Sequence, residues 1–319
     1  MLQRIHVLLG QEPYKSLRDQ YIPGAKNRVV GVYVGWRGES LPGNFDYATF
    51  FDRRDAAVRV GHGDVPELFT RLAKIQGLHN KNGKDFTTLI TVGHSFGGQV
   101  VFSAVSDLLK ARIADATEVV PHPPGSGPLP MLHGFGDLVL LVNPAQEASI
   151  YESIHDLMRN ETFSEEQAPI LMTISSEGDW PNRRFFPFGR TLGVRHEPYG
   201  TPEQYRAKTR SHGNYAPHLT HCLFVTGGVP CKGLPPPPPS IGPQNFDLRL
   251  ANAARYGATS LYPLAPIDPN NPFLVVKATR DVIPGHNDMF AQPLIEFVAE
   301  FVGLAQLKRL INPTARGVY

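Results

Sequence analysis

The stretch TLITVGHSFGGQVVFSAV, residues Thr88–Val105, joins an apolar, β-branched run to a helical pattern through a glycine-rich turn. Its centre is the pentapeptide Gly-His-Ser-Phe-Gly, with Ser95 in the middle. A G-x-S-x-G pattern alone is weak evidence, because Gly and Ser are common. A buried strand before it and a helix after it make it a sharp turn that holds the serine hydroxyl above the sheet. We therefore predict that Ser95 is a nucleophile and that the backbone N–H of Phe96 faces the developing oxyanion.

The glycines of this turn have a predicted role of their own. A Cβ atom at Gly93 or Gly97 is expected to crowd the neighbouring strand and helix, and Gly98 is expected to keep the helix close to the sheet. The alternatives are a structural glycine turn and a helix N-terminus that binds phosphate. Neither G-x-x-x-x-G-K-[ST] nor G-x-G-x-x-G occurs in the sequence, which disfavours the phosphate site.

Further apolar runs surround this stretch and alternate with helical patterns. The predicted strands are 28–35, 87–92, 138–142, 170–174 and 273–278. The predicted helices begin near Asp64, after Ser95, at Ala148 and at Pro293. The strands do not alternate cleanly between apolar and polar residues, which is typical of strands buried on both faces. The pattern predicts a doubly wound, mostly parallel α/β sheet.

Composition excludes several classes of protein. The 319 residues contain 31 Lys and Arg against 29 Asp and Glu, which argues against sequence-independent binding of nucleic acid. No apolar run approaches the roughly 20 residues of a membrane-spanning helix, and the start has no signal-peptide pattern. We expect a soluble protein and leave its location open. Cys222 and Cys231 either pair or stay as two thiols.

Two proline-rich segments, 121–130 and 232–243, are predicted to be surface spacers rather than docking sites. Between residues 183 and 271 periodic runs are few, which predicts a lid or binding excursion inserted before the last strand. The expected organisation is a core over 1–182, an excursion over 183–271, and the end of the core over 272–319.

The strand, sharp turn and helix around Ser95, together with the order of elements, resemble the α/β-hydrolase superfamily, of the serine esterase and lipase type. The run VGVYVGWRG, residues 30–38, also resembles a strand found in little-characterised bacterial hydrolases. In that fold the catalytic residues follow the order Ser, acid, His. Asp179 follows the strand 170–174 and is the favoured acid, with Glu177 as the alternative. His286, in the loop between the last strand and the last helix, is the predicted base.

The resemblance implies an esterase that forms an acyl-enzyme and needs no cofactor or metal. The candidate pocket residues are Trp36, His94 and Trp180. The histidines His212, His218 and His221 match no common zinc spacing, so packing in the lid is preferred.

The resemblance is incomplete at the oxyanion site. The fold normally takes a second N–H from a His-Gly loop after its third strand. Counting back from Ser95, the run 28–35 occupies the fourth place, so Gly35–Gly38 is not that loop. We expect that the chain begins after the third strand; alternatively, Val7–Gly10 is a degenerate third strand and Gln11 supplies the N–H.

A missing strand would expose a sheet edge and favour a homodimer through strand pairing. Two functions stay open at this point: an active ester hydrolase, and a hydrolase-fold binding or scaffold protein with a weakened oxyanion site.

Overall fold

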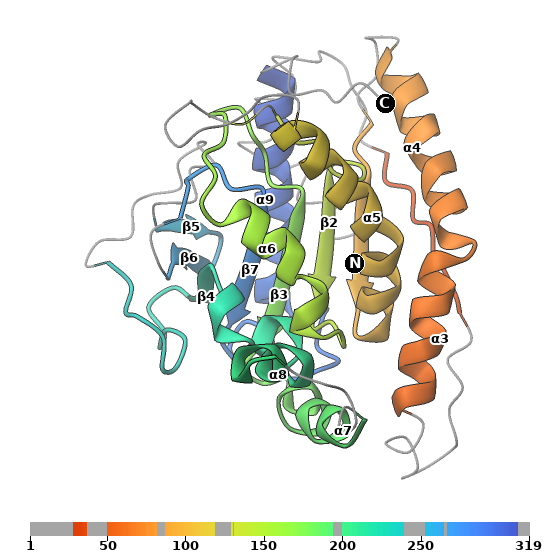
Figure 1. The fold of residues 1–319 in the computed structure, drawn as a ribbon. Helices are drawn as coiled ribbons and strands as arrows, with labels where there is room; N and C mark the ends of the chain where they lie inside the picture. The colour runs from red at the N-terminus through yellow and green to blue at the C-terminus, as the bar shows by residue number, and fades with distance from the viewer. Residues whose placement is uncertain are drawn as a thin grey trace.

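A mostly parallel β-sheet forms the centre of the molecule (Figure 1). The computed structural model describes residues 28–36, 50–81, 87–118, 129, 131–193, 200–238, 253–264 and 267–311. In these ranges the sheet has the strand order β1-β2-β3-β7-β4-β6-β5. The strands are β1 (Ile90–His94), β2 (Leu138–Val142), β3 (Leu171–Ser176), β4 (His221–Val225), β5 (Ala254–Tyr256), β6 (Thr259–Pro263) and β7 (Phe273–Ala278). Strands β1, β2, β3, β7 and β4 run parallel, and β6 lies antiparallel to both β4 and β5.

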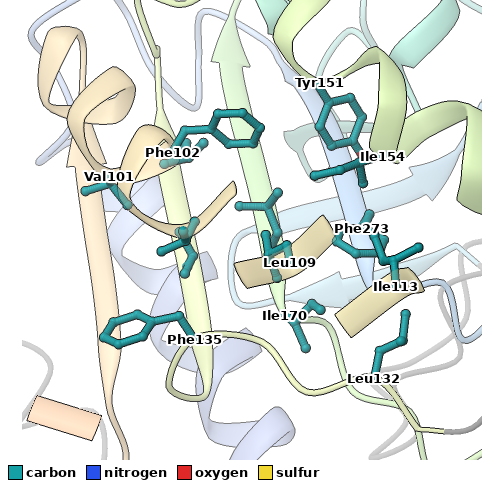
Figure 2. Close-up of a cluster of buried hydrophobic side chains, with 14 of the residues drawn as sticks. Val101, Phe102, Leu109, Ile113, Leu132, Phe135, Tyr151, Ile154, Ile170 and Phe273 are labelled. Atoms are coloured by element: carbon teal, nitrogen blue, oxygen red, sulfur yellow. The ribbon is translucent and has the colours of Figure 1, made fainter. Parts of the chain in front are cut away.

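Helices cover both faces of the sheet (Figure 1). Helix α5 (Phe96–Glu118) and helix α6 (Glu152–Met158) pack on one face, and α9 (Gln292–Ile311) packs on the other. Figure 2 shows the core between the sheet and α5. The other helical elements are α3 (Phe50–His62), α4 (Val65–Lys81), η2 (Ala148–Ile150), η3 (Pro181–Phe185), α7 (Phe186–Gly193), α8 (Pro202–Thr209), η4 (His212–Asn214) and η5 (Ala216–His218).

Alternate residues of β2 serve the two faces. Val139 and Leu141 join the α5 core, whereas Leu138, Leu140 and Val142 join the α9 core, and all are buried. This two-sided burial explains why the strand sequence does not alternate in polarity. The prediction of a mostly parallel α/β sheet with helices on both faces is confirmed, and β2 and β7 have the predicted bounds.

The predicted strand over residues 28–35 is wrong for the structure described. The segment is not part of the sheet, and most of its apolar side chains are exposed, with Tyr33 at 94% and Val30 at 67%. A β-propensity pattern becomes a strand only beside a partner. Among the described strands β1 pairs with β2 alone, and none pairs with this segment. The homodimer through an open edge stays a prediction.

The segment 183–271 differs from the expected lid. The part from residue 221 onwards supplies β4, β5 and β6, which extend the sheet beyond β7. Only the helical part, α7 to η5, lies against the carboxyl ends of the parallel strands (Figure 1). Cys222 on β4 and Cys231 form a disulfide, which settles the alternative left open by the sequence.

Several predictions fall outside the described residues: Val7–Gly10, Gln11, most of the first proline-rich segment, and the end of the second. Within the described ranges, no helix has both the length and the apolar composition needed to cross a membrane.

Candidate active site

Ser95 lies between β1 and α5 in the left-handed backbone region, with φ +53°. Its N–H donates to the carbonyl of Val142 at 3.2 Å, and its carbonyl accepts from the N–H of Ala145 at 3.0 Å. A non-glycine residue in this region is strained and persists only where the surroundings hold it. The end of β2 therefore fixes the sharp turn that carries the hydroxyl.

The glycines of the turn differ in how closely they are approached. A Cβ at Gly93 would lie 2.7 Å from the carbonyl oxygen of Gly97, and one at Gly98 would lie 2.8 Å from Cβ of Pro144. A Cβ at Gly97 would meet nothing within 4 Å. The expectation of crowding is confirmed at Gly93 and Gly98 and is wrong at Gly97, because that glycine faces away from the strand.

Three side chains from the ends of three strands meet at the carboxyl edge of the sheet. His286 Nε2 lies 2.8 Å from Ser95 Oγ, and His286 Nδ1 lies 2.8 Å from Asp179 Oδ1. The side chain of Asp179 is fully buried, and that of His286 is 16% exposed. A carboxylate at Nδ1 favours the tautomer with its proton there, which leaves Nε2 to accept from the serine hydroxyl.

The acid is held by Asn182, a residue that the sequence analysis missed. Its backbone N–H donates to Asp179 Oδ1 at 3.1 Å, and its Nδ2 donates to Oδ2 at 2.8 Å. Both carboxylate oxygens are thus satisfied in a buried site. Asp179 precedes the helical turn η3, and a carboxylate that bonds an N–H three positions later is a common capping pattern, which could have pointed to this contact.

Glu177, the alternative acid, faces another way. Its Oε1 accepts from the backbone N–H of Lys232 at 2.6 Å. The structure therefore brings Asp179, and not Glu177, to the imidazole.

The acid loop and the histidine loop lie in direct contact. A Cβ at Gly178 would be 2.0 Å from the carbonyl oxygen of Pro284, so only glycine allows this approach. Ser176 Oγ donates to the carbonyl of Ile283 at 2.5 Å, which joins the two loops a second time.

The three predicted pocket residues occupy different environments. His94 Nε2 lies 2.7 Å from the carbonyl oxygen of His286. Burial lowers the pKa of His94, and this hydrogen bond opposes the shift in part, so the ring is neutral at pH 7 and donates from Nε2. Trp180 directly follows the acid, is 53% exposed, and packs edge-to-face on Phe185. Trp36 is partly buried against the core on the α5 side.

The predicted oxyanion donor is the N–H of Phe96, the first residue of α5. The N-terminus of a helix carries partial positive charge, which favours an anion at this end. Gln11, the alternative second donor, lies outside the described residues.

The three clustered histidines contact aromatic and hydroxyl side chains. His212 and His218 are buried beside Tyr151, with their ring centroids 5.5 Å apart, whereas His221 Nδ1 contacts Thr220 Oγ1. In the described ranges, no group of His, Cys, Asp or Glu side chains is arranged to hold a metal ion.

Comparison of the chain with protein-family models, with curated proteins and with solved structures finds no match. A serine hydroxyl bonded to an imidazole, which is in turn bonded to a buried carboxylate, is able to perform nucleophilic attack with general-base assistance.

Proposed function

We propose that this protein is a serine hydrolase of the α/β-hydrolase type that cleaves carboxylic esters through an acyl-enzyme. The observation that carries the proposal is the bridging position of His286, 2.8 Å from both Ser95 Oγ and Asp179 Oδ1. The φ of +53° at Ser95 supports it, because the nucleophile of such an elbow is held in a strained turn.

In the proposed mechanism, Ser95 Oγ attacks the ester carbonyl while His286 Nε2 removes its proton. Asp179 holds the imidazole and stabilises the positive charge that develops on it. The N–H of Phe96 stabilises the negative charge on the former carbonyl oxygen. His286 then protonates the leaving alcohol, and a water activated by the same imidazole hydrolyses the acyl-enzyme.

Hydrolysis of short p-nitrophenyl esters tests the proposal. We expect the wild-type chain to turn over the ester and to react covalently with a fluorophosphonate, and Ser95→Ala to do neither. Ser164→Ala is the matched control, because it removes a serine hydroxyl outside the triad, one that accepts from the nearby backbone N–H of Glu166. Equal labelling of the wild type and Ser95→Ala would refute the proposal.

The second candidate is a hydrolase-fold binding protein. It is favoured because the described residues offer one candidate oxyanion donor, the N–H of Phe96, whereas the fold normally uses two. Removal of one such donor reduces turnover by about 100- to 1000-fold. The same assay separates the two functions, because a scaffold would show the wild type no faster than Ser95→Ala.

A further inference from the structure

Asn143 is the residue directly after β2, and it lies where the three catalytic loops meet. It is fully buried, and its φ of +45° places it in the left-handed region. With Ser95 it forms the pair of non-glycine residues that have positive φ within the described ranges. Such a conformation is retained only where surrounding contacts determine it.

The side-chain amide of Asn143 joins the acid strand to the histidine loop. Its Oδ1 accepts from the N–H of Ser176, the last residue of β3, at 2.9 Å. Its Nδ2 donates to the carbonyl oxygens of His286 at 3.0 Å and Gly285 at 3.4 Å. An amide offers an acceptor on one branch and two donors on the other, which is what these neighbours need.

The backbone next to this side chain reaches the other two catalytic residues. The carbonyl of Asn143 accepts from Asn182 Nδ2 at 2.9 Å, and the same nitrogen donates to Asp179 Oδ2 at 2.8 Å. Two residues further on, the N–H of Ala145 donates to the carbonyl of Ser95 at 3.0 Å. The short segment after β2 is therefore hydrogen-bonded to Ser95, to His286 and to Asn182, the residue that bonds Asp179.

We propose that Asn143 is a positioning residue, which sets the imidazole of His286 against Ser95 and Asp179 by holding the His286 carbonyl. The bond from His94 Nε2 to the same carbonyl supports it from a second side. The reaction that this serves rests on the proposed function, but the hydrogen bonds do not. Displacement of a reacting group by about 1 Å costs about 100-fold in rate, so an indirect contact of this kind has a measurable effect.

Two substitutions test the inference. Asn143→Asp keeps the shape but replaces the donating amide with an oxygen that faces two carbonyl oxygens. Asn143→Gly removes the amide and accepts the positive φ without strain. Asn160→Asp adds the same charge at an exposed turn and serves as the control. For p-nitrophenyl butyrate we expect kcat to fall by about 100-fold in both Asn143 variants, with KM changed less than about threefold.

A second readout does not depend on catalysis. A proton held between an imidazole Nδ1 and a carboxylate gives a far-downfield proton resonance, which is assigned here by its absence in His286→Gln. We expect Asn143→Gly to lose or shift this resonance while its circular dichroism spectrum and cooperative melting are retained.

The outcomes separate the two proposals. Unchanged kcat and an unchanged resonance in both Asn143 variants would overturn the positioning role and leave the proposed function intact. A wild type that shows the resonance but neither hydrolyses esters nor reacts with a fluorophosphonate would remove the proposed function; loss of the resonance in Asn143→Gly would then still support the positioning role. Unfolding of Asn143→Gly would assign the residue to the fold and overturn the inference.

Discussion

Asp179 and Glu177 stand two positions apart after β3, but three donors surround only Asp179: His286 Nδ1 and two groups of Asn182. In Asp179→Asn an amide NH2 must face one of these donors, which disturbs the orientation and tautomer of His286. We expect kcat to fall by about 10,000-fold. Glu177→Gln is the matched control, because the remaining carbonyl still accepts from the N–H of Lys232. Steady-state kinetics that show equal losses in both variants would contradict the assignment.

The sequence predicts the three residues of the triad because each has a topological place: just after a strand, in a fixed order along the chain. Asn143 also directly follows a strand, but neither Asn143 nor Asn182 has a place in that fixed order. Their amides bond partners 143 and 39 positions away, so their roles depend on how the loops pack. An Asn-Pro pair after a strand predicts a turn and says nothing about what the side chain holds.

At the scale of elements, the contact between β1 and α5 depends on individual glycines. Gly93→Ala would place a methyl group 2.7 Å from the carbonyl oxygen of Gly97, so the strand and the helix must move apart. Gly97→Ala meets nothing and adds a better helix former in the first turn. We expect Gly93→Ala to lose at least about 1–3 kcal/mol of stability and most activity, whereas Gly97→Ala keeps both. Urea unfolding and ester hydrolysis measure the two effects, and equal tolerance of both substitutions would contradict the close packing.

Elements were predicted well where burial is two-sided and poorly where it depends on a distant neighbour. β2 and β7 have the predicted bounds, and every residue of both strands is buried. Helix α3 was not predicted, because its sequence is polar and its contact with α5 is a close approach at Gly61. A Cβ there would lie 2.6 Å from the carbonyl oxygen of Val100. The run 28–35, in contrast, has a strong β-strand pattern in its sequence but pairs with none of the described strands.

The whole molecule shows how far the chain order determines the sheet. The parallel part follows from the alternation of strands and helices. The antiparallel part, β4 with β6 and β5, comes from a region rich in Pro and Gly that has few periodic runs. Long-range pairing across this region decides its structure, so the sequence predicted an excursion where the molecule builds three more strands.

Two buried histidines of this same region, His212 and His218, are expected to make the stability of the molecule depend on pH. His218 and His212 pack against Tyr151, and His218 also contacts the ring of His155. Within the part of the chain described, His218 Nδ1 and His212 Nε2 are buried and have no hydrogen-bond partner. Burial, followed by the nearby His155, lowers the pKa of His218 from 6.5 to about 3, and Asp156 opposes this only in part. Burial, followed by His218 and His155, lowers the pKa of His212 well below 6.5.

Both folded-state pKa values lie below the unfolded value of 6.5, so the unfolded chain binds more protons as the pH falls below 6.5. The stability contributed by the two neutral rings is present above pH 6.5 and is lost as the pH falls towards 3. Each ring is expected to reduce the free energy of unfolding by about 1.4 kcal/mol per pH unit in this window. Urea unfolding at pH 7, 6 and 5 measures the slope. His218→Phe keeps an aromatic ring against Tyr151 but cannot take up a proton, so its slope is expected to be smaller than that of the wild type by up to about 1.4 kcal/mol per pH unit. Equal slopes would show that His218 is already charged in the folded protein, or that its burial has no such effect.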